Sequence, residues 1–301
     1  MACFNPIHGW RAKALSVNGK HSFTISRHEA YVDFPMSIPC GQCIGCRLDR
    51  SKAWAVRCMH EAQLHSENCF ITLTFDDDHL KHSLSVRDFQ LFMKRLRKEI
   101  SPKKIRFFHA AEYGELLERP HHHSIIFGYD FPDKYLWKIN NGVRLFRSPL
   151  LEALWPYGFS SIGSVSFDSA AYVARYCLKK INGPVADSHY SKVNVLTGEV
   201  SKVLPEFTTM SRRPGIAHDW IIDFHDDVYT KDCVVVRDKF IVRPPKYYDK
   251  IYDVIDSDRL AMLKKQRIIK ASDNSDNSYE RRETKEFIQL RKADALIRQM
   301  Y

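Results

Sequence analysis

Three consecutive histidines, His121 to His123, lead into an apolar segment with the pattern of a β-strand. Because side chains alternate along a strand, the imidazoles of His121 and His123 project from the same face. Glu112 ends another strand-like segment nine residues earlier. If the two segments form an antiparallel hairpin, two imidazoles and a carboxylate converge. Such a set can hold a divalent cation with positions open to water or a phosphate oxygen, although a histidine pair on a strand is also compatible with a structural role.

The segment from 170 to 181 has the spacing of a helix and carries two tyrosines. Tyr172 and Tyr176 are four residues apart, so both phenols lie on one helical face. Lys179 and Lys180 extend this face by one turn. Taken alone, such tyrosines are typical packing residues, and such lysines are typical of a solvated last turn that complements the helix dipole.

A phenol on this helix would attack a phosphate as a phenolate. With a pKa near 10, tyrosine is about 0.1% ionised at pH 7, so presenting phenolate costs about 4 kcal/mol. A metal ion that polarises the phosphate and a lysine that stabilises negative charge can offset a cost of that size. The histidine strand and the tyrosine helix together therefore favour metal-assisted phosphoryl transfer over two unrelated structural roles.

Three cysteines are crowded into one short segment, at Cys40, Cys43 and Cys46. Spacings of this kind suit a chelating turn, and Cys3 is the natural fourth ligand of a structural four-thiolate zinc site. Unliganded thiols and an iron–sulfur cluster are the alternatives, because thiolates suit either metal. Eight cysteines in 301 residues are too sparse for a disulfide scaffold and are consistent with a reducing compartment.

The composition favours a polyanionic partner. Lysine and arginine exceed aspartate and glutamate by 46 to 36, which gives a formal charge of +10 and a pI near 9.1. Nucleic acid is favoured over membrane, because no apolar run approaches the length of a membrane span. The N-terminal sequence lacks the features of a signal peptide, so we expect the protein to stay in the compartment that makes it.

The order of predicted elements is β-α-β-β-α-β, followed by the tyrosine helix. This order predicts an α+β fold in which helices cover a central antiparallel sheet. The elements are a strand at 69–75, a helix from 85 to about 100, strands at 105–112 and from the histidines onward, a helix at 148–155 and a strand at 158–167. A further helix with an apolar stripe is expected at 47–66.

The ends of the chain carry weaker signals. Residues 1 to 39 are expected to be irregular, and the arginine pair Arg212 and Arg213 lies in a segment that could contact phosphate or be a plain surface loop. The C-terminal half predicts a hairpin at 232–243, helix at 247–271, a hydrophilic break at 272–278 and a charged tail helix. We divide the chain into an N-terminal cysteine cluster and helix (1–68), a core (69–183), an extension with the hairpin (184–271), and the break and tail (272–301).

Three ordered motifs resemble those of HUH endonucleases, whose core is a ferredoxin- or RRM-like α+β fold. The motifs are the strand at 70–75, the run Arg119-Pro120-His121-His122-His123 and the helix from Tyr172 to Lys180. The two-tyrosine form is similar to the rolling-circle replication initiators of microviruses. The cysteine cluster with Arg47, the stretch from Trp54 to Arg57 and Glu112-Tyr113-Gly114-Glu115 look more narrowly like the gokushovirus branch. His122 departs from the family, which usually has an apolar or aromatic residue there, and we expect it to face away from the metal.

The resemblance implies that His121, His123 and Glu112 hold Mg²⁺ or Mn²⁺ against the scissile phosphate of single-stranded origin DNA. Tyr172 or Tyr176 would attack, leaving a 5′-phosphotyrosine and a free 3′-hydroxyl. The second tyrosine would then cut the regenerated origin while the released hydroxyl reseals the first strand.

The same resemblance implies that Lys179, with Lys180 as a second candidate, stabilises charge on the phosphate or phenolate. Candidate DNA contacts are Arg119, Lys104 and Arg106 for the backbone and Tyr113 for base stacking. The expected partners are single-stranded origin DNA and a bacterial host's polymerase and helicase, in the host cytoplasm, with no membrane.

Three other functions use part of the same pattern. An HUH transposase or relaxase would use the same residues, but the cysteine cluster and the compact length fit a phage initiator better. A non-haem iron oxygenase also uses two histidines and a carboxylate, but it predicts an all-β fold and no role for the tyrosines. A non-enzymatic, zinc-stabilised single-stranded DNA-binding or packaging protein would need neither Tyr172 nor Tyr176.

Overall fold

The computed structural model describes residues 3–17, 19, 21–114, 117–140, 142–176, 180–181, 183, 185–193, 197–237, 240–272, 276 and 278–298. The chain forms two compact units, one of Ser51–Ala261 and one of Met1–Arg50 with Met262–Tyr301. Within the described residues, no helix combines the length and the hydropathy that a membrane span would need.

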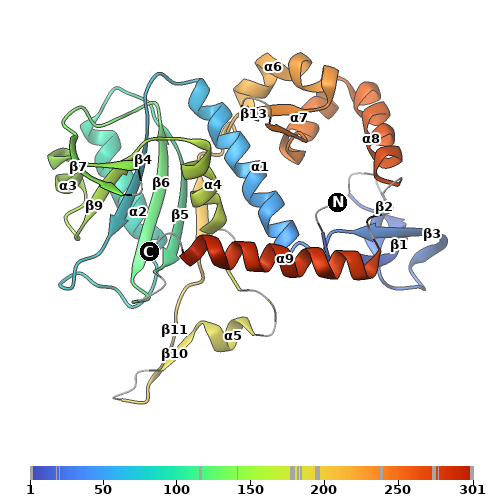
Figure 1. The fold of residues 1–301 in the computed structure, drawn as a ribbon, viewed down its shortest axis with the longest axis horizontal. Coiled ribbons are helices and arrows are strands. Elements are labelled where there is room, and N and C mark those ends of the chain that lie inside the picture. Colours follow the sequence, from blue (N-terminus) through green and yellow to red (C-terminus); the bar gives the residue numbers. More distant parts are fainter. Residues whose placement is uncertain are drawn as a thin grey trace. The chain divides into compact units, whose positions relative to one another are not determined.

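The larger unit is built on an antiparallel sheet that contains seven strands among the described residues, in the order β12-β5-β6-β4-β9-β8-β7 (Figure 1). The strands are β4 (Asn68–Thr74), β5 (Arg106–Tyr113), β6 (Pro120–Phe127), β7 (Tyr135–Asn140), β8 (Val143–Arg147), β9 (Ser160–Gly163) and β12 (Phe207–Met210). The predicted pairing of β5 with β6 is confirmed, with Glu112 directly opposite His121. The predicted α+β class is likewise confirmed.

Helices pack against both faces of this sheet. On one face, α2 (Val86–Glu99) and α3 (Pro149–Leu154) enclose the main hydrophobic core. Trp155 at its centre is fully buried, and its indole N–H donates to the carbonyl of Thr74 over 3.0 Å. On the other face, Trp54 of α1 (Ile44–Gln63) packs on Phe108 of β5, and α4 (Phe167–Tyr176) contacts β5 and β6.

Further elements follow the core along the chain. They are α5 (Ala186–His189), β10 (Ser191–Val193), β11 (Val200–Lys202), α6 (His218–Lys231), β13 (Val234–Arg237), β14 (Phe240–Val242), α7 (Lys246–Ile255), α8 (Ser257–Ser272) and α9 (Tyr279–Arg298). The predicted hairpin is present as β13 and β14. The single helix predicted at 247–271 is wrong, because the helix breaks at Asp256, whose carboxylate accepts from the backbone N–H of Arg259.

The prediction that residues 1 to 39 are irregular is wrong. The smaller unit contains a sheet of β1 (Ile7–Leu15), β2 (His21–Thr24) and β3 (Ala30–Ile38), in the order β2-β1-β3. Pro35 suggested a break, but it lies in β3 at the edge of the sheet, where a missing N–H is tolerated. Few side chains of these strands are buried, so they lack the apolar alternation that identifies a half-buried strand.

His60 joins three helices of the larger unit. Its ring stacks on Trp220 of α6 with 3.5 Å between centroids, and its Nδ1 lies 2.8 Å from the hydroxyl of Tyr248 on α7. The side chain is buried, and this burial lowers the pKa of His60 to about 3. The folded protein therefore holds His60 neutral at pH values where an exposed histidine is charged.

This burial makes stability depend on pH. In the unfolded chain His60 takes up a proton below about pH 6.5, while in the folded chain it does so near pH 3, so its contribution is complete above pH 6.5 and is lost as the pH falls. At pH 4.5 the loss is about 3 kcal/mol, from two pKa units at about 1.4 kcal/mol each. We expect His60→Gln to lose less stability than wild type between pH 7 and pH 4.5, measured by urea unfolding. Equal losses in the two proteins would contradict this.

Candidate active site and cysteine cluster

His121, His123 and Glu112 lie on one face of the β5–β6 hairpin, as the alternation of strand side chains requires. The Nε2 of His123 lies 3.0 Å from Oε1 of Glu112, and both side chains are almost fully buried. The rings of His121 and His123 are parallel, with 6.3 Å between centroids. Two imidazole nitrogens and a buried carboxylate are a donor set that fits a divalent cation, because the cation would compensate the buried negative charge.

Backbone and side-chain contacts orient both imidazoles. His121 Nδ1 lies 2.6 Å from the carbonyl oxygen of Arg119, so in the neutral ring Nδ1 carries the hydrogen and Nε2 the lone pair. His123 Nδ1 lies 3.1 Å from the hydroxyl of Thr72 on β4. Contacts of this kind fix the tautomer and the ring orientation of metal-binding histidines.

Gly114 leaves the space in which the His121 ring lies. A Cβ built on Gly114 would come within 2.9 Å of Cε1 of His121, closer than side-chain carbons approach one another. The N–H of Gly114 also donates to the carbonyl of Arg119 over 2.8 Å, which closes the start of the turn between the strands. Any larger residue here would displace the His121 ring.

Tyr172 is the tyrosine that the described side chains bring to this face of the sheet. Its ring lies edge-on to His123, with 5.5 Å between centroids and an interplanar angle of 87°. Tyr176 ends α4, one turn further along the helix, and its side chain is outside the described set. Lys180 is exposed, and Lys179 lies outside the described residues.

His122 faces the opposite side of the sheet, in the core. Its Nδ1 lies 3.0 Å from Nε2 of His109 on β5, and His109 Nδ1 lies 2.9 Å from the hydroxyl of Thr209 on β12. Burial, reinforced by neighbouring histidines, lowers the pKa of His122 to about 3 and holds that of His109 well below its usual value. Both rings are therefore neutral, and one donates to the other.

The four candidate DNA contacts differ in how they are held. Arg119 pairs with Asp77, and the Nε of Arg106 lies 2.5 Å from Oε1 of the buried Glu61. The hydroxyl of Tyr113 donates to the carbonyl of Leu204 and accepts from the N–H of Leu84, over 2.8 and 3.0 Å. Lys104 is exposed. Arg106 and Tyr113 are thus bound into the fold, whereas Lys104 faces solvent.

The four cysteines of the N-terminal cluster lie together in the smaller unit. Among the described residues, Cys3, Cys40, Cys43 and Cys46 form a group whose sulfur atoms all lie within 4.8 Å of one another. The Cys3 sulfur lies 3.7 Å from that of Cys40 and 4.0 Å from that of Cys43. A tetrahedral zinc with Zn–S bonds of about 2.3 Å places its sulfurs about 3.8 Å apart. The cluster could therefore bind a metal such as zinc.

Hydrogen bonds distribute negative charge unevenly over the cluster. Burial would raise the pKa of Cys43, but hydrogen bonds from the backbone of Cys46 and Phe4 and from neighbouring thiols outweigh burial and lower this pKa to about 7. Burial raises the pKa of Cys46 and that of Cys3. Backbone amides directed at sulfur, such as the Cys40 N–H donating to Cys3 Sγ over 3.2 Å, stabilise thiolates.

Known proteins resemble most of this chain. A family model for replication-associated proteins of the ORF2 type matches residues 68–181. Replication-associated protein VP4 of Bdellovibrio phage phiMH2K is 32% identical over 265 residues, covering 84% of this chain and 77% of the relative. The chain belongs to the family of phage replication-associated proteins. The resemblance to microvirus rolling-circle initiators is thereby confirmed, and membership supports a role in phage DNA replication.

Two further members of the family match. Replication-associated protein ORF2 of Spiroplasma virus 4 is 30% identical, over 83% of this chain and 80% of its own length. Replication-associated protein ORF4 of Chlamydia phage 1 is 35% identical, over 53% of this chain and 42% of its own length. No solved structure matches. The segment matched by the family model begins with β4 and extends past α4, and so includes Glu112, both site histidines and Tyr172.

Sequence analysis missed several residues that position this site. Thr72, beside His123, could have been found from its place on a strand that pairs with the histidine strand. His109 could have been found because alternation puts it on the same face as His122. Thr209 gave no signal, because β12 joins the sheet from about one hundred residues away.

Proposed function

We propose that this replication-associated protein nicks and rejoins single-stranded phage origin DNA through a 5′-phosphotyrosine intermediate. The observation that carries the proposal is the position of Tyr172, whose ring lies edge-on to His123, which in turn lies 3.0 Å from Glu112. A phenol beside a donor set for a divalent cation is the arrangement that phosphoryl transfer needs. The fold adds support, because it is α+β rather than the all-β fold expected of a non-haem oxygenase.

In this proposal Glu112, His121 and His123 hold Mg²⁺ or Mn²⁺, which when bound polarises the scissile phosphate and stabilises its negative charge. The oxygen of Tyr172 or Tyr176, having lost its proton, attacks phosphorus. The bond from phosphorus to the 3′ oxygen breaks, and that oxygen leaves as a hydroxyl after taking up a proton. In the rejoining step a 3′-hydroxyl attacks the phosphotyrosine, and the phenol is released.

The remaining residues have supporting roles. Lys180, which is exposed just beyond α4, and Lys179 are proposed to stabilise charge on the phosphate or the phenolate. Arg119 and Lys104 are proposed to contact the DNA backbone; we assign Arg106 a smaller part, since it already pairs with Glu61. The free 3′-hydroxyl would be extended by the polymerase and helicase of the bacterial host.

The proposal predicts how a covalent adduct depends on the two tyrosines. Purified protein is mixed with Mn²⁺ and a 5′-labelled single-stranded origin oligonucleotide whose label lies on the 3′ side of the nick after ligation into the substrate, and label that stays on the protein in denaturant is measured on a gel. We expect each single variant, Tyr172→Phe and Tyr176→Phe, to retain part of the adduct, because the other phenol remains. The double variant should lose it entirely.

Tyr135→Phe is the matched control, because it removes an exposed phenol from the same unit. This control should form as much adduct as wild type. An unchanged adduct in the double variant, or none from wild-type protein on its own origin, would contradict the proposal.

We also propose that the cysteine cluster binds one structural zinc ion. The sulfur distances support zinc, since 3.7 and 4.0 Å are close to the spacing of a tetrahedral four-thiolate site. The zinc would tie the N-terminal residue Cys3 to the turn that precedes α1. Four thiolates close the coordination shell, so this metal would be structural rather than catalytic.

Zinc content can be measured by elemental analysis of the purified protein. We expect about one zinc per chain in wild type and at least a several-fold loss in Cys43→Ser, because one of four ligands is removed. Cys233→Ser, which changes a cysteine outside the cluster, should keep its zinc. Equal zinc in wild type and Cys43→Ser, or iron in its place, would rule out this assignment.

A further inference from the structure

The small sheet of β1, β2 and β3 leaves many apolar side chains exposed. Phe34 is 56% exposed, and Tyr31 and Met36 are each 42% exposed. Most positions of β3 face solvent rather than a core. Clustered exposed apolar side chains of this kind mark a surface that binds a partner.

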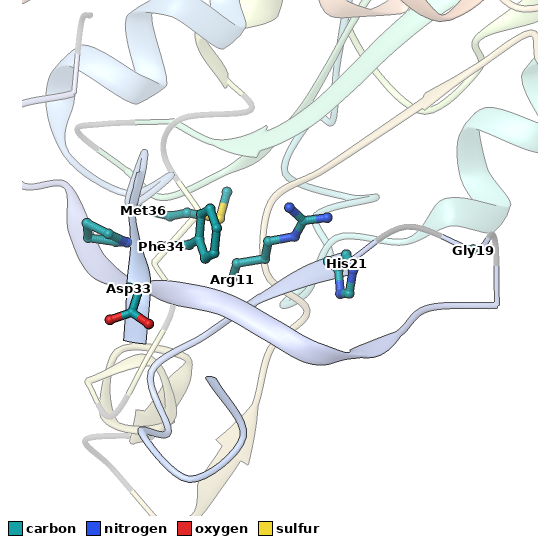
Figure 2. Close-up of a pocket in the computed structure, with 7 residues that line it drawn as sticks. Arg11, Gly19, His21, Asp33, Phe34 and Met36 are labelled. Carbon is teal, nitrogen blue, oxygen red and sulfur yellow. The ribbon is translucent and has the colours of Figure 1, made fainter. Parts of the chain in front are cut away.

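This surface is hollowed on the side of β3 that carries Phe34. A cavity of about 620 Å³ is lined by Arg11, His21, Phe34 and Met36 among others. A second hollow of about 330 Å³ adjoins it and shares Met36. Figure 2 shows the Arg11 side chain beside Phe34 and Met36, while the carboxylate of Asp33 is directed away from them.

Guanidinium groups accompany the aromatic rings on this sheet. Arg11 lies 6.0 Å from the centre of the Phe34 ring, and Arg27 lies 5.6 Å from that of Trp10. Among the described residues, no carboxylate forms an ion pair with either arginine. Aromatic rings interleaved with arginines are the combination that holds bases by stacking and the backbone by charge. Charge therefore favours a polyanion over an apolar protein partner.

We propose that the β1–β3 sheet binds single-stranded nucleic acid. Phe34 stacks on a base, and Arg11 contacts a phosphate beside it. This surface is built from residues outside the proposed catalytic set, so it would hold a strand that the catalytic residues are not cutting. The edge position of β3 leaves the groove open at its side, as a continuous strand requires.

Photocrosslinking tests the location directly. An oligo(dT) of about 16 nucleotides that carries 5-bromodeoxyuridine is irradiated with the full-length Tyr172→Phe, Tyr176→Phe protein without added divalent metal, and adducts are mapped by mass spectrometry. These conditions exclude cleavage, so failure here leaves the adduct experiment on the tyrosines unaffected. We expect adducts on Phe34, Tyr31 or Trp10. Adducts confined to residues 51–261 would overturn the proposal.

Affinity for the same oligo(dT) tests the two contacts. In the Arg11→Ala, Phe34→Ala variant, we expect about tenfold weaker binding through loss of a stacked base. The slope of log affinity against log salt should fall by about 0.7 through loss of one phosphate contact. The matched control is Leu15→Ala with Lys292→Ala, which removes one exposed apolar side chain and one positive charge elsewhere in the same unit.

The control should bind as wild type, and Phe34→Trp should also bind as wild type, because it keeps a ring that can stack. Wild-type affinity in the Arg11→Ala, Phe34→Ala variant would overturn the proposal. So would a dimer, detected by sedimentation, that this variant abolishes while its affinity for oligo(dT) is unchanged. If the double variant does not fold, the crosslinking map and the salt slope of Arg11→Gln alone decide.

Discussion

The candidate active site depends on the register of β5 against β6. Glu112 is paired directly with His121, and the diagonal neighbour His123 is thereby brought within 3.0 Å of the carboxylate. Because strand side chains alternate, a slip of one residue would turn the histidines to the opposite face. Every other feature of the site, including the approach of the tyrosine helix, follows from this pairing.

The core face of the same strands helps to hold that register. His122 bonds to His109, and His109 bonds to Thr209, so three neighbouring strands are linked beneath the site. Both histidines are buried and neutral, and His109 stacks on Phe89 of α2 with 3.7 Å between centroids. A polar pair in a core is costly unless it is hydrogen-bonded, and when bonded it favours one arrangement over its alternatives. The histidine triplet thus contributes to both faces of the sheet.

Local pattern was sufficient to predict the elements that build the site. Period-two alternation predicted the shared face of Glu112, His121 and His123, and helical spacing predicted α4. What could not be predicted depends on contacts distant in sequence or on exposure. β12 is short and pairs with β5 across about one hundred residues, and the β1–β3 sheet has few buried side chains to produce a pattern. Sequence-based inference was strongest where one face of an element is buried and weakest where both faces meet solvent.

The most direct measurement is to identify the residue that carries DNA after reaction with the origin. Protein that has reacted with origin DNA is treated with nuclease and trypsin, and the nucleotide-bearing peptides are sequenced by mass spectrometry. Cleavage after Arg175 separates Tyr172 from Tyr176, so each is identified independently. The account predicts a 5′-phosphonucleotide on one or both of these tyrosines. The same modification on a tyrosine outside α4, or on a serine, would contradict it.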